Sequence, residues 1–345
     1  MMDFFKEKPI MTLTPLLRKS LVCAALALTF GAAQAQNFSF GLWGDMPYAK
    51  AGDQAKIPAV LKSINQSDIA FSIYDGDIKD GSSKCTDDIY TAALSMFGEM
   101  KKPVIYVPGD NEWTDCHRLN NGGYDGLERL SHVRKVMFPT ANSLGKTTLP
   151  LEHQGQRGEA FYENTRFRHN GIVFVGLNMP GSNNNKILNE KDCAKKSART
   201  PAQCEASNAE YLERDAANVT WMAESFATAK ASKAAGIVLV IQADPGFDLP
   251  ETEDLDESQN PAVSGYRNFM DKLASETEQF KGQVLFVHGD THYFKLDKPL
   301  YAPNRMLGNF TRLETFGSPQ IHWVRVTVDA KSENVFTVHP VIVKQ

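Results

Sequence analysis

Four segments of the sequence have the same order of residues: an apolar run, then glycine, then aspartate. They end at Asp45, Asp77, Asp110 and Asp290, and His292 follows the last aspartate by two residues. The carboxyl ends of parallel strands line one crevice in α/β folds, so we expect the four carboxylates to converge. The glycines let the backbone turn sharply and approach a ligand closely. Because unpaired carboxylates repel each other in a partly buried crevice, their convergence predicts bound cations.

Five motifs in this order resemble those of the calcineurin-like metallophosphoesterases, the superfamily that includes the purple acid phosphatases. The family's pattern is Asp-x-His, Gly-Asp-x-x, Gly-Asn-His-Glu, a lone His after an apolar strand, and Gly-His-x-His. The matching segments are residues 45–47, 76–79, 109–112, 242–245 and 289–292, so the resemblance covers roughly residues 40–295. It implies an α/β fold, a sandwich of two mixed β-sheets flanked by helices.

The resemblance also implies a centre of two divalent metal ions that share one bridging carboxylate. The first ion would be held by Asp45, Asp77 and His292, and the second by Asp77, Asp110 and Asp290 together with Gln242 or Asp244. The fourth motif leaves these two alternatives because residues two apart on a strand point the same way.

Several ligands of the family are replaced in this sequence. Pro47 stands where a histidine is expected and cannot bind a metal, although its neighbour Tyr48 can. Asp110 replaces the asparagine ligand, and Asp290 replaces a histidine. The set is therefore more negative and richer in oxygen, which favours Mg²⁺, Mn²⁺ or Ca²⁺, while iron and zinc stay candidates.

Asn111 occupies the position of the family's catalytic histidine. An amide donates a hydrogen bond to an oxyanion but cannot deliver a proton at neutral pH. His117, six residues downstream, is the nearest alternative acid, and a surface histidine is its other interpretation. Lys79 is a candidate to hold a phosphate oxygen, and His288 fits a core histidine equally well.

Apolar runs alternate with stretches of helical periodicity along the chain, which predicts an α/β fold. We expect strands at 38–43, 69–74, 103–107, 171–177, 236–241 and 284–288, and two closing antiparallel strands after residue 315. Apolar stripes that begin at Ile57, Ile89, Leu212 and Tyr266 predict helices. No linker or repeat divides residues 36–345, so we expect one metallophosphoesterase-like domain with insertions at about 179–205 and 244–258.

Residues 1–35 have the pattern of a secretory signal peptide. Arg18 and Lys19 precede an apolar run at 21–31, and Ala33-Gln34-Ala35 matches a cleavage site. The run is shorter than the roughly 20 apolar residues that span a bilayer, and no later stretch qualifies, so we expect no membrane anchor after cleavage. The protein is expected to be exported, either to a periplasm or into the medium.

Four cysteines remain after cleavage at this site, and an even set in an oxidising compartment forms disulfides. Of the three possible pairings we favour Cys193–Cys204, which closes a short polar loop, and Cys85–Cys116, which joins two loops that also carry acidic motifs. A zinc site is the rival interpretation, although the sequence has no CxxC spacing.

The composition is that of an ordinary globular protein, with 42% hydrophobic and 23% charged residues among 345. A net charge of −4 gives no electrostatic footprint for nucleic acid. Together with the signal peptide, the resemblance to metallophosphoesterases implies an exported, metal-dependent hydrolase of phosphate mono- or diesters that acts on a small-molecule phosphate ester. The alternatives are a non-catalytic secreted binding protein that retains the fold and an acidic cation site, and a protein in which calcium is purely structural.

Overall fold

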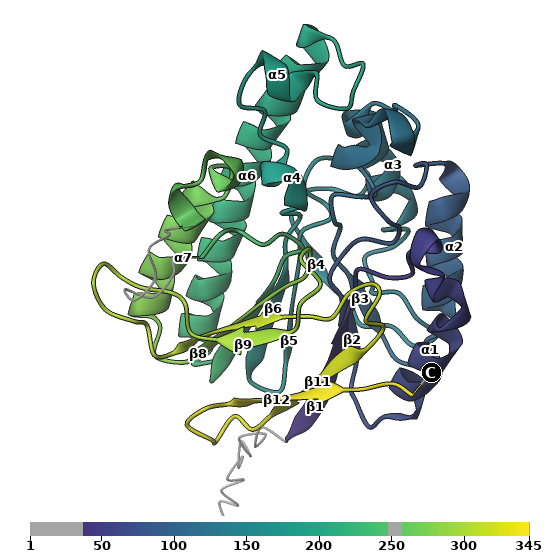
Figure 1. Cartoon of the computed structure of the whole chain (residues 1–345). Helices are drawn as coiled ribbons and strands as arrows, with labels where there is room; N and C mark the ends of the chain where they lie inside the picture. Colours follow the sequence, from purple (N-terminus) through teal and green to yellow (C-terminus); the bar gives the residue numbers. More distant parts are fainter. Residues whose placement is uncertain (1–36, 248–256, 345) are drawn as a thin grey trace, which may run out of the picture. The chain divides into compact units, whose positions relative to one another are not determined.

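The computed structural model describes residues 37–247 and 257–344. Two β-sheets face each other, and helices cover the outer face of each (Figure 1). The predicted sandwich of two mixed sheets flanked by helices is therefore confirmed. The predicted signal peptide lies outside the described residues, as does most of the acidic insertion at 244–258. No helix of the described residues is long and apolar enough to cross a membrane.

The five-stranded sheet has the order β12-β11-β1-β2-β3. Its strands are β1 (Phe38–Trp43), β2 (Ser72–Tyr74), β3 (Val104–Tyr106), β11 (Trp323–Val328) and β12 (Phe336–Val341). The first three are parallel, and β11 pairs antiparallel with both β1 and β12. The two closing antiparallel strands predicted from the alternation after residue 315 are thus confirmed, and they extend the sheet from its first strand.

The seven-stranded sheet has the order β4-β5-β6-β7-β8-β10-β9. Its strands are β4 (Glu152–His153), β5 (Thr165–His169), β6 (Ile172–Gly176), β7 (Gly236–Val240), β8 (Gln283–His288), β9 (Lys295–Asp297) and β10 (Phe310–Glu314). The parallel core of the sheet runs from β6 through β7 and β8 to β10. Antiparallel strands complete both edges.

Helices are divided between the two sheets. The α-helices are α1 (Ile57–Gln66), α2 (Asp87–Gly98), α3 (Gly126–Val136), α4 (Gly181–Asn184), α5 (Glu190–Cys193), α6 (Pro201–Ala231) and α7 (Arg267–Gln279). Short 3₁₀ turns are η1 (Ala49–Ala51), η2 (Asp53–Ala55), η3 (Thr114–His117), η4 (Leu119–Asn121), η5 (Glu257–Gln259) and η6 (Pro261–Val263). Helices α1, α2 and α3 pack on the five-stranded sheet, and α6 and α7 on the seven-stranded one.

The apolar core lies in three layers, one between the sheets and one under each group of helices. Between the sheets, Phe40 stacks on Phe71 with 5.6 Å between ring centroids, and Phe174 meets Phe40 edge-to-face at 5.1 Å. Each buried side chain of this size contributes about 1.5–3 kcal/mol relative to leaving it exposed. The sandwich therefore fixes the strand ends that carry the glycine-aspartate loops.

The insertion predicted at 179–205 is more ordered than expected. It contains the short turn α4, whose residues Ser182 and Asn183 have left-handed backbone, and the single turn of α5, and α6 begins inside it at Pro201. Thr200 caps α6: its hydroxyl accepts from the Gln203 amide, and the Gln203 side chain accepts from the Thr200 amide. Proline at the first helical position after such a cap is a recognised start signal that the Asn- and Lys-rich composition concealed.

Both predicted disulfides are present. Cys85 pairs with Cys116 across 5.7 Å between Cα atoms, and Cys193 pairs with Cys204 across 5.9 Å. The rival zinc interpretation of these cysteines is therefore wrong, since their sulfur atoms are bonded to one another. The two disulfides agree with export to an oxidising compartment.

Candidate metal centre

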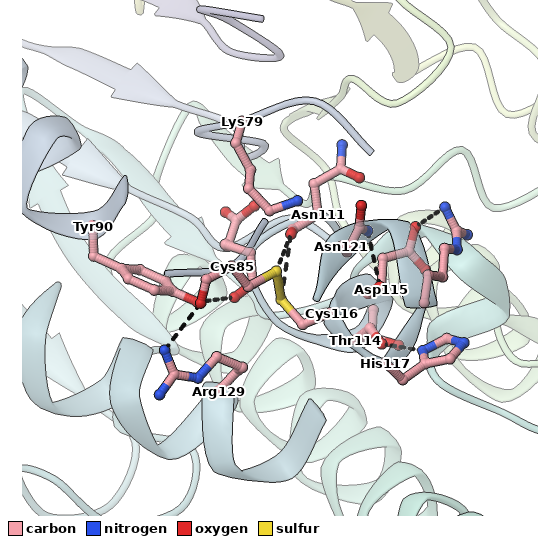
Figure 2. The surroundings of a disulfide bond; sticks show 12 residues. Lys79, Cys85, Tyr90, Asn111, Thr114, Asp115, Cys116, His117, Asn121 and Arg129 are labelled. Atoms are coloured by element: carbon pink, nitrogen blue, oxygen red, sulfur yellow. Dashed lines mark hydrogen bonds and ion pairs between the residues drawn. A yellow bond between two sulfur atoms is a disulfide. The ribbon is translucent and has the colours of Figure 1, made fainter. Parts of the chain in front are cut away.

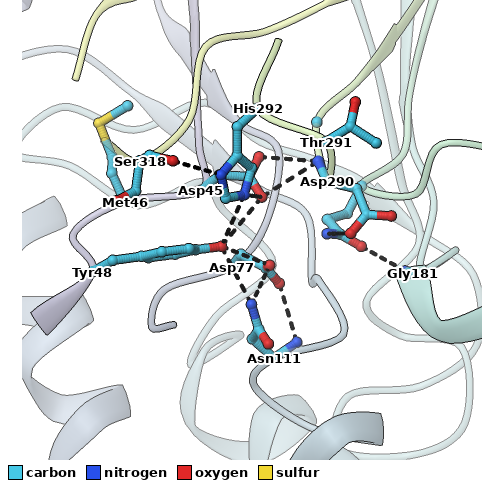
Figure 3. Close-up of polar contacts among 12 residues, drawn as sticks. Asp45, Met46, Tyr48, Asp77, Asn111, Gly181, Asp290, Thr291, His292 and Ser318 are labelled. Atoms are coloured by element: carbon cyan, nitrogen blue, oxygen red, sulfur yellow. Dashed lines mark hydrogen bonds and ion pairs between the residues drawn. The ribbon is translucent and has the colours of Figure 1, made fainter. Parts of the chain in front are cut away.

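The predicted acidic residues meet at the carboxyl ends of strands from both sheets. Asp45 follows β1, Asp77 follows β2, Asp110 follows β3 and Asp290 follows β8. The backbone amide of Asp290 lies 3.3 and 3.4 Å from the two carboxylate oxygens of Asp45 and donates to them, which joins the two sheets at this point (Figure 3). The convergence that the strand-end pattern predicted is thus observed.

An open hollow of about 400 Å³ lies over these loops, and we call it the acidic depression. It is lined by Tyr48, Asp77, Gly81, Asp110, Asn111, Asp115, Arg118, Ser182, Asp290 and His292. Asp45 lies beneath them, fully buried. The depression is thus open to solvent above a layer of buried carboxylates.

The glycines make room for neighbouring carboxylates. A Cβ at Gly109 would overlap the Asp77 carboxylate, and one at Gly289 would overlap that of Asp45. Gly109 and Gly289 do not have left-handed backbone, whereas three of the aspartates do. The φ angles of these aspartates are 50° at Asp45, 62° at Asp77 and 71° at Asp290. Such backbone costs of order 1–3 kcal/mol at each residue and clusters at functional sites.

Tyr48 is the residue that the ligand prediction left out. Its hydroxyl donates to Asp77 Oδ2 at 2.9 Å and lies 3.5 Å from Asp45 Oδ1 and 3.3 Å from His292 Nε2. Burial and the charges of Asp77 and Asp45 raise the pKa of Tyr48 well above its usual value, so the phenol is neutral near pH 7. Its place beside Pro47 in the motif was the available signal.

Asn111 lies directly on Asp77. Its backbone amide donates to Asp77 Oδ1 at 3.1 Å, and its side-chain amide donates to Asp77 Oδ2 and, at 3.3 Å, to the hydroxyl of Tyr48. The residue at the family's catalytic position therefore faces the acidic depression, where its amide hydrogens meet the carboxylate expected to bridge the metals.

Gln242, rather than Asp244, reaches the other carboxylates. Its side-chain amide donates to Asp290 Oδ1 at 3.2 Å and to Asp110 Oδ1 at 3.5 Å. The Asp244 carboxylate instead accepts from the Gly246 amide at 3.1 Å, within its own turn. Strand alternation did not apply to this pair because β7 ends at Val240, before either residue.

His292 is oriented by the chain that leads into β11. Its Nδ1–H donates to the Ser318 carbonyl at 2.7 Å, which directs Nε2 to within 3.3 Å of Asp45 Oδ1. Burial alone would lower the pKa of His292, but the hydrogen bond to Asp45 and the charge of that carboxylate outweigh this effect and raise the pKa to about 9. A backbone acceptor on the far nitrogen is the usual support of a metal-binding histidine.

Mutual repulsion governs the electrostatics of the site. Burial, followed by the charges of Asp110 and Asp45, raises the pKa of both Asp77 and Asp290 well above the usual carboxyl range. Among the ion pairs of the described residues, none joins a lysine or arginine to Asp45, Asp77, Asp110 or Asp290. These carboxylates are therefore not ion-paired with a lysine or arginine, and the nearby cationic groups are His292 beside Asp45, the buried Lys79, whose charge interacts with that of Asp77, and Arg118 at the edge of the depression.

Glu112 supports the site from below and was missed as a contributor. Its Oε1 accepts from the Gly109 amide at 2.7 Å, the Tyr106 hydroxyl at 2.8 Å and the Asp77 amide at 3.3 Å. One buried carboxylate thereby holds two neighbouring glycine-aspartate loops together. Its place after Asn111, at the glutamate of the family's third motif, was the signal.

Three other candidates lie away from the acidic depression. His117 donates from Nδ1 to the Thr114 carbonyl at 2.6 Å, and burial lowers the pKa of His117 to about 4. Lys79 is buried, and its ammonium donates to the Asp80 carbonyl at 3.0 Å. His288 is fully buried in β8, as its core interpretation expected. His117 therefore stays neutral near pH 7 and is poorly suited to donate a proton there.

The side chains of the acidic depression meet the needs of a metal ion only in part. No three or more His, Cys, Asp or Glu side chains within residues 37–247 and 257–344 form a group that could hold a metal ion as they stand. The Tyr48 hydroxyl and the Asn111 and Gln242 amides donate to the carboxylate oxygens that a metal would need. The types of ligand nevertheless suit hard divalent cations, because the site offers buried, mutually repelling carboxylates that form no ion pair with a lysine or arginine.

Comparison with solved structures identifies the fold. The chain aligns with PhoD at a TM-score of 0.55 and 11% identity, over 86% of this chain and 65% of that one. This chain shares the fold of PhoD. That likeness agrees with the calcineurin-like fold implied by the motifs, and this chain spans about two thirds of the PhoD chain.

Two further structures align less closely. GAP50, the anchor in the inner membrane complex of Plasmodium, has a TM-score of 0.44 and 14% identity over 90% of both chains. The sulfate thiohydrolase SoxB of Thermus thermophilus has a TM-score of 0.38 and 14% identity, over 86% of this chain and 42% of that one. No family model matches the sequence, and no curated protein sequence matches it significantly.

Proposed function

We propose that this protein is an exported, metal-dependent hydrolase of phosphate mono- or diesters. The observation that carries the proposal is the convergence of four buried or half-buried aspartates and His292 beneath an open depression, without a lysine or arginine partner. Maintaining such repulsion costs stability, and a bound cation would offset that cost. The fold shared with PhoD and the order of the motifs support the same conclusion.

The proposed ligands divide between two ions. Asp45, Asp77 and His292 would hold one ion, and Asp77, Asp110, Asp290 and Gln242 the other. Divalent ions in such centres lower the pKa of bound water and stabilise charge on phosphoryl oxygens. Binding requires the hydrogen bonds of Tyr48 and Asn111 to Asp77 to be rearranged, since the same oxygens accept them.

The chain's own residues have distinct parts in the proposed reaction. Asn111 faces the acidic depression and can donate a hydrogen bond to an ester oxygen, but it has no proton to transfer. The buried Glu112 keeps the loops of Asp77 and Asp110 in register. Hydrolysis should therefore favour esters whose leaving group departs without protonation.

One set of observations favours a second candidate, a secreted binding protein that retains the acidic site without turnover. Hydroxyl and amide donors lie between the carboxylates, and asparagine stands at the family's catalytic position. Metal analysis followed by an assay panel separates the two candidates. The purified protein would be stripped of metal, loaded with Mg²⁺, Mn²⁺, Ca²⁺, Zn²⁺ or Fe²⁺, and assayed with nitrophenyl phosphate and bis(nitrophenyl) phosphate.

The hydrolase is supported if at least one ion restores turnover in the wild type and Asp77→Asn removes it. Asp271→Asn is the matched control, because Asp271 is an exposed aspartate on α7. Stoichiometric metal binding without turnover of either ester would overturn the hydrolase in favour of the binding protein.

A further inference from the structure

A second cavity lies beside the acidic depression and shares three of its residues, Asp115, Arg118 and Ser182. Its volume is about 250 Å³, and we call it the basic cavity. One side is η3 with the residues that follow it, and the other is the segment from α4 to the start of α6. A ligand anchored in the acidic depression therefore has a neighbouring space to extend into.

The basic cavity has the opposite charge to its neighbour. Its cationic side chains are Arg118, Lys186, Lys195, Lys196 and Arg199, against the carboxylates of Asp115 and Asp192. Of the five cations, only Arg118 forms an ion pair among the described residues, with Asp115. The cavity thus holds an excess of positive charge in a protein whose net charge is −4.

Two of the four cations outside ion pairs, Arg199 and Lys186, are held in position by backbone contacts. The Arg199 guanidinium donates to the Cys193 carbonyl at 3.1 and 3.3 Å and to the Asp192 carbonyl at 3.4 Å. The Lys186 ammonium donates to the Ser264 carbonyl at 3.3 Å. Carbonyl partners orient these groups without neutralising them, so their charge stays available to an anion.

The two walls of the basic cavity are joined directly. The Leu119 amide donates to the Lys196 carbonyl at 2.9 Å, and the Ser197 hydroxyl donates to the His117 carbonyl at 3.2 Å. The Cys85–Cys116 disulfide ties one wall to the loop before α2, as Figure 2 shows, and Cys193–Cys204 ties the other wall to α6. A cavity held in this way is preorganised, which lowers the cost of binding.

From this juxtaposition we infer that the substrate carries a second anionic group, which the basic cavity binds while the ester phosphate lies in the acidic depression. This inference rests on the proposed function and narrows its substrate class to small phosphate esters with an additional phosphate or carboxylate. Lys195 and Lys196 are exposed at the cavity and contact the second anion, together with the oriented Arg199. Their charge also attracts a polyanion towards an otherwise acidic site.

The test uses phosphonates, because their P–C bond is not hydrolysed and binding is read without turnover. Isothermal titration calorimetry of the metal-loaded protein would compare methylphosphonate with diphosphonates linked by one to four methylenes, and with phosphonoacetate and 3-phosphonopropionate. We expect at least one of the probes with two anionic groups to bind about tenfold more tightly than methylphosphonate, which has only one. Whether a diphosphonate or a phosphonocarboxylate binds most tightly shows whether the cavity prefers a phosphate or a carboxylate as the second anion.

Lys195→Gln/Lys196→Gln is expected to reduce that preference to about twofold while leaving methylphosphonate binding unchanged. The matched control is Lys101→Gln/Lys102→Gln, which removes another adjacent exposed pair that precedes β3, at the far end of this strand from Asp110. The inference is overturned if the wild type binds probes with one and with two anionic groups equally tightly. It is also overturned if the preference for two anionic groups survives the Lys195/Lys196 change. Failure of the proposed function is read separately, as absence of ester hydrolysis with every metal.

Discussion

The acidic depression and the basic cavity share Asp115, Arg118 and Ser182, yet different means hold them in place. The aspartates of the first directly follow β1, β2, β3 and β8, so two hydrogen-bonded sheets fix them. The second lies between segments outside both sheets, which two disulfides and the isolated bridge between Arg118 and Ser197 hold together. Strand pairing thus determines one site, and cross-links determine the other.

The largest effect is expected from Asp77→Ala, which alters only the site that the sheets hold. A bridging carboxylate serves two ions, so its loss leaves both under-coordinated and the variant should bind neither. Elemental analysis of the dialysed protein measures this, with Asp271→Ala as control. Two ions per chain in the variant would show that Asp77 is not the bridge.

The next effect concerns Asn111 and the leaving group. Because general acid catalysis contributes about 10²–10⁴-fold, the wild type should hydrolyse nitrophenyl esters at least about 100-fold faster than alkyl phosphates. Asn111→His should recover part of the alkyl activity. Comparison of kcat/KM for both esters in both proteins measures the effect. Equal wild-type rates on the two esters would mean that chemistry does not limit turnover or that another residue supplies the proton.

Removal of each disulfide sharpens the contrast between the two sites. Cys193→Ser/Cys204→Ser should lower the free energy of unfolding by about 2–4 kcal/mol and abolish the preference for diphosphonates, with metal content unchanged. The Cys85–Cys116 disulfide closes a longer loop, so its removal in Cys85→Ser/Cys116→Ser should cost at least as much. Urea unfolding followed by fluorescence gives both values. Loss of metal from the first variant would contradict the independence of the two sites.

The smallest effect is the pH dependence contributed by His117, which lines the basic cavity. Burial lowers the pKa of His117 to about 4 in the folded protein, below its ordinary value of about 6.5. Below pH 6.5 the unfolded chain therefore binds a proton that the folded one does not, and stability falls until about pH 4. When the pH is lowered from 7 to 4.5, the Tm of the wild type should fall by about 2 °C or more in excess of the fall measured for His117→Gln. Parallel changes in both proteins would contradict this assignment.

The strand ends were predictable because apolar runs and glycine-aspartate pairs are local signals. All six predicted strand runs overlap an observed strand, and both disulfide pairings hold. Helix α3 was not predicted, since its apolar stripe is narrow and interrupted by charged residues. Leu212 was assigned to the apolar face of its helix but is 63% exposed, because the buried face of α6 at this level is formed by Tyr211, Arg214 and Asp215 instead.

The side-chain geometry of the site needed the structure. Tyr48 reaches Asp77 across 29 positions of sequence, and the choice of Gln242 over Asp244 depends on where β7 ends. Four of the five cations of the basic cavity lie in the Asn- and Lys-rich insertion at 179–205, but nothing in the sequence showed that this segment pairs with Arg118 through a bridge at Ser197. Long-range contacts of this kind leave no periodicity in the sequence.

The antiparallel pairing of β11 with β1 has a consequence for the order of assembly. Ser318, just before β11, donates its amide to the Asp45 carbonyl at 2.9 Å and accepts from His292. A ribosome therefore releases Asp45, Asp77 and Asp110 long before it has made the residues that close the site around them. Pairing partners this distant in sequence also slow folding. The acidic residues of an emerging chain are therefore not yet assembled into a site that could chelate a metal. If the protein is exported as proposed, the metal it binds would be set by the ions available in the compartment where folding finishes.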